Sequence, residues 1–173
     1  SVASRGLGDV YKRQVLLCID AIQQLGALPF DVQQNRCAFA MADGHKWMLG
    51  PEGLGVFYCR SDLRDQLKLH EYGWHMLEHA GDYDRTDWEP ARSARRFECG
   101  SPNLLGAMAL EASLSLLEEV GMEQVAAALD ERVEWLCRGL GDLGGVDILS
   151  PTTAERRAGI LTFRLHGLSL IHI

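Results

Sequence analysis

The chain has 173 residues, of which 47% are hydrophobic and 24% are charged, and its formal net charge is −7. This mixture is typical of a soluble globular protein and excludes an intrinsically disordered chain. The acidic balance argues against nucleic acid as a partner, because phosphate binding depends on clustered Lys and Arg. No run approaches the roughly 18 apolar residues that a membrane span requires, so we expect no membrane partner.

The cysteines indicate a reducing compartment. They are odd in number, widely spaced and without a C-x-x-C pair: Cys18, Cys37, Cys59, Cys99 and Cys137. This pattern argues against a disulfide scaffold and against a cysteine zinc site. The sequence therefore predicts a cytoplasmic protein.

The two ends of the chain match each other at the level of codons. Residues 9–14 read DVYKRQ and residues 168–173 read LSLIHI. When LSLIHI is back-translated as CTG TCT CTT ATA CAC ATC, its reverse complement encodes DVYKRQ. The pair resembles a transposase end sequence used in sequencing libraries. We therefore expect residues 1–14 and 168–173 to be non-native, and the remainder to be an internal part of a longer protein.

Three short apolar runs come first along the remaining chain. Residues 15–19 (VLLCI) and 37–42 (CAFAMA) have the composition of buried strands, the first of them parallel, with a turn or short helix at 21–26 between them. Residues 56–59 (VFYC) form a third, β-branched and aromatic strand. Their close spacing predicts the parallel or mixed sheet of an α/β domain.

A long stretch without clear periodicity follows. Residues 61–69 are expected to form a short helix capped by Ser61. Residues 71–96 are rich in aromatic, polar and glycine residues, and a loop of that length is usually functional or mobile.

Two helices are expected after this loop. The first covers 103–120 and ends at Gly121 as its C-cap. Its apolar stripe is expected to consist of Leu105, Met108, Ala109, Ala112, Leu116 and Val120. The second covers 122–140, with an apolar face of Val125, Leu129, Val133, Leu136 and Leu140. Residues 146–149 and 159–165 then have the pattern of strands belonging to a second domain.

One lysine lies in a glycine-rich setting just after a predicted buried strand. The chain has only Lys12, Lys46 and Lys68, and Lys46 lies in DGHKWMLGPEGLGVFYCR. Ligand sites in open α/β sheets lie at such strand ends. A lysine amine can act as a nucleophile or form a Schiff base with a carbonyl group. The alternative is an ordinary surface lysine on a loop.

Asp20 and Gln23 follow the first predicted strand. A carboxylate can pair with the pyridine nitrogen of pyridoxal phosphate, which lets the ring take up electrons from a substrate carbanion. A glutamine amide beside the ring can donate a hydrogen bond to the phenolic oxygen. Taken alone, Asp20 could equally be a helix N-cap.

Three segments together resemble one known family. Residues 19–32 (IDAIQQLGALPFDV) contain an Asp-x-x-Gln pair, and residues 43–58 (DGHKWMLGPEGLGVFY) contain His-Lys followed by Gly-Pro-x-Gly. Residues 96–103 (RFECGSPN) resemble an R-F-E-x-G-T-P-N segment. All three are similar to the class V aminotransferase and cysteine desulfurase family of fold-type I pyridoxal-phosphate enzymes.

The resemblance implies a role for each matching residue. Lys46 would hold pyridoxal phosphate as a Schiff base and act as catalytic base and acid, with Asp20 on the pyridinium nitrogen and Gln23 on the phenolic oxygen. His45 would contact the phosphate, and Ser101 would reach the phosphate of the partner subunit in a homodimer. The substrate would be a free amino acid, and the reaction a transamination, desulfuration or epimerisation.

The implied fold class is α/β, part of a pyridoxal-phosphate-dependent transferase fold. Residues 15–143 would belong to the large cofactor-binding domain, with its mixed sheet and helices, and 144–167 to the start of the small α+β domain. The glycine-rich phosphate loop, the carboxylate-binding arginine and any catalytic cysteine would lie outside this chain, so the fragment alone should be inactive. One departure is Asp43, where the desulfurase branch usually has Ser or Thr.

Two other functions remain open. His75, Glu78 and His79 match the H-x-x-E-H pattern of zinc proteases, which needs a stable helix and a third ligand. Because glycines flank this stretch, an exposed polar loop is the preferred interpretation, with a zinc-dependent hydrolase as the alternative. A non-catalytic relative that keeps the fold as an interaction module is the other possibility.

Overall fold

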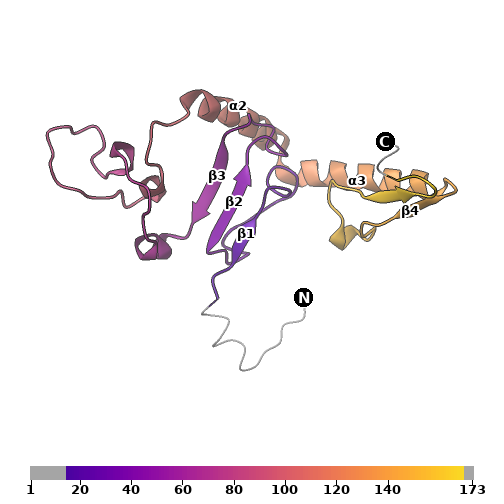
Figure 1. The fold of residues 1–173 in the computed structure, drawn as a ribbon. Coiled ribbons are helices and arrows are strands. Elements are labelled where there is room, and N and C mark those ends of the chain that lie inside the picture. Colours follow the sequence, from indigo (N-terminus) through magenta and orange to yellow (C-terminus); the bar gives the residue numbers. More distant parts are fainter. Residues whose placement is uncertain (1–14, 170–173) are drawn as a thin grey trace.

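A computed structural model describes residues 15–169, which form a mixed sheet, two consecutive helices and a C-terminal hairpin (Figure 1). The proposed non-native ends fall almost entirely outside the described residues, so the prediction about them stays untested. None of the helices in residues 15–169 combines the length and the apolar character needed to cross a bilayer.

The sheet consists of the three strands that the sequence predicts. Within the described residues they are β1 (Cys18–Asp20), β2 (Phe39–Asp43) and β3 (Gly55–Cys59), in that order across the sheet. β1 pairs with β2 in parallel, and β2 pairs with β3 in antiparallel fashion. The carboxyl ends of β1 and β2 therefore lie at the same edge of the sheet as the amino end of β3.

The centre of the sheet is built from small side chains. Ala38, Ala40 and Ala42 alternate along β2 and its approach, and each is at most 6% exposed. Such alternation is expected where one face of a strand is covered. Of the first apolar run, only Cys18 and Ile19 belong to the strand, which ends at Asp20, and Val15 is 75% exposed. Among the described strands β1 is an edge strand, paired on one side only.

Helix α2 (Leu104–Val120) lies across the end of the sheet at which β1 and β2 finish (Figure 1), where Leu110 packs with Ala42 and Met48. The side chain of Asn103 caps it by accepting a hydrogen bond from the Gly106 N–H at 2.9 Å. Gly121, with φ of +86°, ends it, as predicted.

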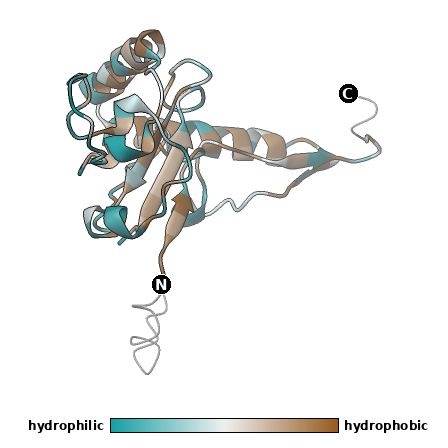
Figure 2. Ribbon diagram, turned by 60° about the vertical axis from the view of Figure 1, so that its left-hand side comes forward, coloured by the Kyte–Doolittle hydropathy of each residue, from teal (hydrophilic) through white to brown (hydrophobic). Residues whose placement is uncertain are grey.

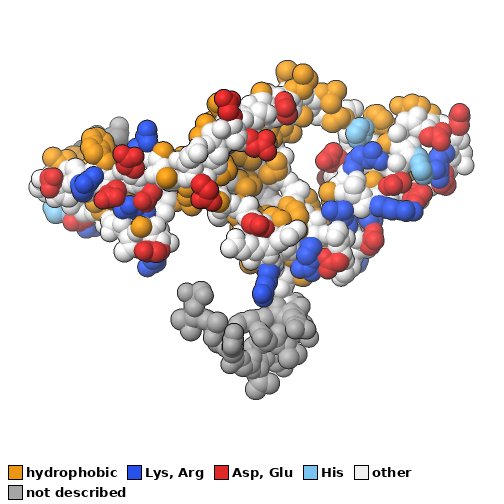
Figure 3. Space-filling view, turned by 180° about the vertical axis from the view of Figure 1, so that it is seen from behind, with side chains coloured by type: hydrophobic (Ala, Val, Ile, Leu, Met, Phe, Trp, Pro, Cys, Tyr) orange, Lys and Arg blue, Asp and Glu red, His pale blue; other side chains and the backbone are white. Residues whose placement is uncertain are grey.

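The predicted buried stripe of α2 is wrong. Its buried residues are Gly106, Leu110 and Leu117, whereas Leu105 is 81% exposed and Met108 70% exposed. Apolar residues occupy almost every face of this helix, so two stripes have a helical period and the sheet selects one of them. The other stripe gives the apolar surface seen at the top of Figure 3, over the beginning of α2.

The segment between β3 and α2 is mostly irregular. The expected helix at 61–69 is a 3₁₀-helix, η1 (Ser61–Gln66), whose N-cap is Arg60 without any side-chain cap. The capping prediction for Ser61 is therefore wrong, because Ser61 already lies inside the first turn. Two short 3₁₀ turns follow, η2 (Trp74–Met76) and η3 (Ala94–Phe97).

Helix α3 (Met122–Gly141) carries the C-terminal hairpin, in which β4 (Val146–Ile148) pairs in antiparallel fashion with β5 (Phe163–Leu165). The two strands agree with the prediction. The helix presents an amphipathic face of the predicted register, on which Val133 is 4% exposed (Figure 2). We call residues 144–167 the hairpin segment; the domain boundary at 143/144 stays a prediction.

One arginine anchors the hairpin segment to α3. Arg157, just after η4 (Ala154–Arg156), has a side chain only 9% exposed and forms a two-armed ion pair with Asp130. A third bond reaches Glu134 Oε2 at 3.3 Å, and a fourth reaches the Thr152 carbonyl at 3.2 Å. The hydrogen bonds from Arg157 lower the pKa of the Asp130 carboxyl below its usual value.

This ion pair predicts a pH dependence of stability. Because the pKa of Asp130 is lower in the folded state, its contribution is complete above the unfolded value of about 4. The contribution is lost as pH falls through the lower, folded value. Asp130→Asn should therefore unfold at lower urea than wild type at pH 7, and the difference should shrink towards pH 2. Asp84→Asn, on an exposed loop, is the matched control and should show no such convergence.

Candidate active site

Two carboxylates lie at the sheet edge where β1 and β2 end. Asp20 and Asp43 line the same cavity of about 270 Å³. Its other lining residues are Ile22, Met41, Ala42, Gly55 and Val56. One oxygen of Asp20 accepts a hydrogen bond from the Ile22 N–H at 3.1 Å, which fixes the carboxylate at the end of the strand. Asp43 thus shares the site edge with Asp20.

Lys46 lies in a tight turn that follows β2. We call residues 44–50 the lysine turn. The Gly50 N–H donates to the Gly44 carbonyl at 2.8 Å, and the Leu49 N–H to the Lys46 carbonyl at 3.1 Å. His45 and Lys46 are exposed, and within residues 15–169 the Lys46 amine has no hydrogen-bond or ion-pair partner. The backbone of the turn is therefore fixed while its amine is available.

Glycines allow close contacts on two sides of the lysine turn. Gly26 has a φ of +90°, and a Cβ atom on it would overlap the Trp47 carbonyl and lie 2.6 Å from the Met48 nitrogen. On the α2 side, a Cβ atom on Gly50 would lie 2.6 Å from Leu110 Cδ1. The turn is thus wedged between the 21–26 turn and α2.

Gln23 is joined directly to the lysine turn. The indole N–H of Trp47 donates to Oε1 of Gln23 at 3.2 Å, across 24 residues of sequence. This bond brings the residue after Lys46 against Gln23, three residues beyond Asp20 at the end of β1. Of the four predicted residues Asp20, Gln23, His45 and Lys46, only Asp20 lines the small cavity, and only Gln23 is bonded to the lysine turn. Their convergence on one opening therefore stays a prediction.

Ser101 lies apart from this group. It is exposed and precedes the cap of α2, whereas the contact of α2 with the lysine turn is made by Leu110. Leu110 lies six positions after Leu104 in the helix, a rise of about 9 Å at 1.5 Å per residue. The single chain accordingly does not test the predicted contact of Ser101 with a partner subunit's cofactor.

The zinc-protease pattern lacks the geometry that it needs. His75 lies in the 3₁₀ turn η2, while Glu78 accepts a hydrogen bond from the Arg92 N–H at 2.7 Å and His79 lies 3.8 Å from Glu89. A helix that would place both histidines on one face is not formed. Within the described part of the chain, no three His, Cys, Asp or Glu side chains are grouped so as to hold a metal ion.

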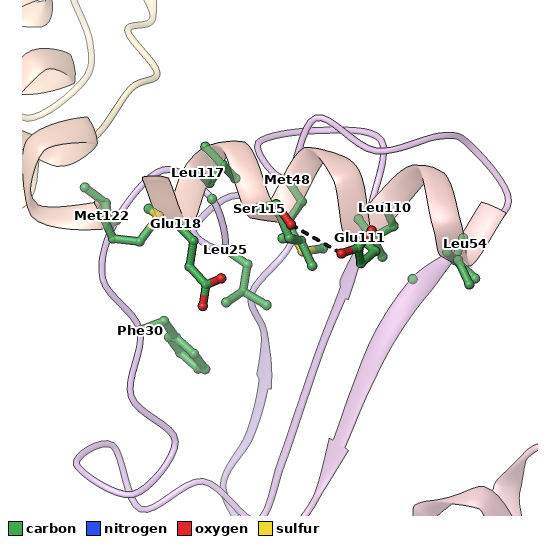
Figure 4. A pocket seen from close by; sticks show the side chains of 15 residues that line it. Leu25, Phe30, Met48, Leu54, Leu110, Glu111, Ser115, Leu117, Glu118 and Met122 are labelled. Carbon is green, nitrogen blue, oxygen red and sulfur yellow. Dashed lines mark hydrogen bonds between the residues drawn. The ribbon is translucent and has the colours of Figure 1, made fainter. Parts of the chain in front are cut away.

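A second, larger cavity of about 720 Å³ lies between α2 and residues 25–30 (Figure 4). Its walls are largely apolar, with Leu25, Phe30 and Leu110 among them. At its rim the Ser115 hydroxyl donates to Glu111 at 3.4 Å. None of the predicted site residues lines it, so its size does not make it the chemical site.

Three residues of the candidate site were not identified from the sequence. Trp47, Gly26 and Gly159 all contact the lysine turn or form part of it, and a Cβ atom on Gly159 would lie 2.9 Å from Trp47 Cζ2. The sequence marks them as site residues only weakly, because two of them are glycines and the third directly follows Lys46.

Comparisons with known proteins agree with this arrangement. The family model described as aminotransferase class V matches residues 5–172. A probable cysteine desulfurase of Streptomyces coelicolor is 34% identical over 150 residues, which are 87% of this chain and 35% of that protein. The chain spans about a third of the length of the curated relatives that it matches.

Solved structures give the same result. The apo cysteine desulfurase of Thermococcus onnurineus NA1 superposes with a TM-score of 0.81 at 28% identity, over 94% of this chain and 40% of that one. A C-DES variant with glycine covalently linked to its PLP cofactor gives 0.72 at 29% identity, over 83% and 37%. These similarities confirm the predicted fold class.

Proposed function

We propose that this chain, which belongs to the class V aminotransferase family, supplies the lysine, aspartate and glutamine of the active site of an enzyme acting on amino acids. The observation that carries the proposal is the joining of two strand ends. The Trp47–Gln23 hydrogen bond holds the turn that contains Lys46 against the segment that begins with Asp20.

The family depends on pyridoxal phosphate, so the cofactor prediction is confirmed. The residues at the sheet edge fit this group by their chemistry. Asp20 offers a carboxylate at the end of β1, and Gln23 has amide hydrogens left after its oxygen is bonded. The amine of Lys46 has no partner among residues 15–169. When bound, the cofactor supplies a ring that takes up electrons from the substrate carbon.

The other steps of binding and catalysis are assigned to residues of this chain. We assign to Lys46 the covalent attachment of the cofactor and the transfer of a proton at the substrate carbon. Asp20 would hold the pyridine nitrogen of the cofactor through its carboxylate. His45, next to Lys46 in the turn, is assigned to the phosphate, and Ser101 to the phosphate in the partner subunit of a homodimer. The free cysteines support a cytoplasmic location.

Cysteine desulfuration is the reaction that the relatives favour by name, whereas Asp43 departs from the usual residue of that branch. The intact protein should be purified with pyridoxal phosphate and given L-cysteine and a thiol reductant, with sulfide and alanine measured. The reductant supplies the two electrons that the conversion of cysteine to alanine and sulfide consumes. A parallel assay should follow transfer of an amino group to a 2-oxo acid. Sulfide release supports a desulfurase, and amino transfer an aminotransferase. A protein that binds no pyridoxal phosphate would contradict the proposal.

Asp20→Asn tests the proposed ion pair with the cofactor ring. The variant should keep part of its cofactor but lose about 100-fold in turnover, because a neutral amide no longer favours the protonated ring nitrogen. Asp20→Glu, which keeps the charge, should retain more of the turnover. Steady-state kinetics and cofactor absorbance measure both. Near-normal turnover in Asp20→Asn would remove this role from Asp20.

A further inference from the structure

Trp47 joins separate parts of the chain at the residue next to Lys46. Its indole N–H bonds to Gln23 at 3.2 Å, on the segment after β1. The six-membered ring of the same indole abuts Gly159, in the hairpin segment carried by α3. Trp47 thus touches both the segment after β1 and the hairpin segment.

We propose that Trp47 is a positioning residue that orients the amide of Gln23 towards the cofactor and couples this orientation to the position of the hairpin segment. The proposal rests on the proposed function, because it concerns how the Gln23 amide meets pyridoxal phosphate. It adds Trp47 and Gly159 to the residues on which the site depends.

The orientation follows from the chemistry of the two groups. An indole N–H can only donate a hydrogen bond, so its partner must be the amide oxygen and not the amide nitrogen. With Oε1 bonded to Trp47, the two N–H groups of Gln23 are directed away from the indole. Without that bond the amide can turn over and present its oxygen to the phenolic oxygen of the cofactor, an unfavourable meeting of two acceptors.

The contact with Gly159 depends on the lack of a side chain. A Cβ atom there would overlap Cη2 of the indole and lie 2.9 Å from Cζ2 and 3.2 Å from Cζ3. The φ of Gly159 is not in the left-handed region, so alanine meets no backbone strain at this position. Its effect would come from displacing the Trp47 ring.

The position of Gly159 is itself fixed by α3. Arg157, two residues earlier, is bonded to Asp130 and Glu134 of that helix. Displacement of the hairpin segment along α3 would therefore move Gly159 against the indole. The coupling runs from α3 through Gly159 and Trp47 to Gln23.

The first experiment compares Trp47→Phe, Gln23→Leu and the double variant of the intact protein. Trp47→Phe keeps an aromatic ring and removes the N–H. Each single variant should raise the dissociation constant for pyridoxal phosphate about five- to tenfold and shift the absorbance maximum of the bound cofactor in the same direction. The double variant should equal Gln23→Leu, because both changes act on one bond. Additive effects would overturn the proposal.

The second experiment uses a matched pair of glycines. Gly159→Ala should reproduce the direction of the Trp47→Phe absorbance shift. Gly144→Ala is the control, since this residue is in the same segment, has no positive φ and has nothing within 4 Å of a Cβ atom. Identical spectra for the two alanine variants would overturn the coupling to the hairpin segment.

A third measurement is independent of the cofactor. In the apoprotein labelled with ¹⁵N-tryptophan, Gln23→Leu should shift the Trp47 indole N–H resonance and speed its exchange with solvent. An unchanged resonance would overturn the proposed bond. If wild type fails to bind pyridoxal phosphate, the proposed function fails, while this resonance still decides whether Trp47 holds Gln23.

Discussion

Replacing Lys46 with alanine in the intact protein is expected to abolish covalent attachment of pyridoxal phosphate and to lower turnover about 1,000-fold or more. Lys46 is exposed, and within residues 15–169 its amine pairs with no other group, so its removal leaves the packing of the lysine turn unchanged. The variant should unfold at the same urea concentration as wild type. Borohydride reduction followed by peptide mapping measures the loss of the adduct directly.

Lys68→Ala is the control for this experiment. Lys68 is the other lysine of the described residues and is also exposed, but it follows η1, away from the strand ends. This variant should keep the adduct and the turnover of wild type. An adduct that persists at its normal level in Lys46→Ala would show that another residue holds the cofactor.

Gly26→Ala is expected to destabilise the protein by about 3 kcal/mol or more. Two causes act together at this position. The φ of +90° disfavours any residue with a Cβ atom, and that atom would also overlap the Trp47 carbonyl. Because backbone atoms cannot turn aside as a flexible side chain can, the lysine turn itself must move. Cofactor affinity should therefore fall together with the free energy of unfolding.

Gly53→Ala separates the two causes. Its φ is +77°, close to that of Gly26, but nothing lies within 4 Å of the position of a Cβ atom. Gly53→Ala should lower the free energy of unfolding only by the backbone strain, about 1–2 kcal/mol. It should leave cofactor affinity unchanged. Urea unfolding measures the pair. Equal losses for the two variants would mean that the Gly26–Trp47 contact contributes nothing beyond strain.

Local signals in the sequence were sufficient for most of the fold. The β-branched and alanine-rich runs predicted β2 and β3, and the end of α2 at Gly121 was predicted from its glycine. The buried face of α2 was not predicted, because Leu105 and Leu110 are equally apolar and only the sheet decides which of them is covered.

Some residues of the candidate site could be predicted from local sequence patterns and others could not. Asp20 and Lys46 were predicted because each follows a strand, and strand ends are a local feature. Trp47 was not predicted as part of the site, because its two contacts are with Gln23 and Gly159, which the fold brings together from distant parts of the chain. The sequence alone does not distinguish a glycine that is required for a close contact from a glycine in an open turn.

The contact between Trp47 and Gly159 also has a consequence for how the molecule opens. The strands of the sheet are joined by short stretches of chain, whereas this contact closes a loop that contains both α2 and α3. A contact that closes a long loop with few partners is lost in partial unfolding, before the sheet melts. Amide exchange should therefore be faster in the hairpin segment than in β2. The indole of Trp47 loses its contact with Gly159 at that first step. Gentle heating should therefore weaken the Trp47–Gln23 hydrogen bond while the secondary structure is still intact.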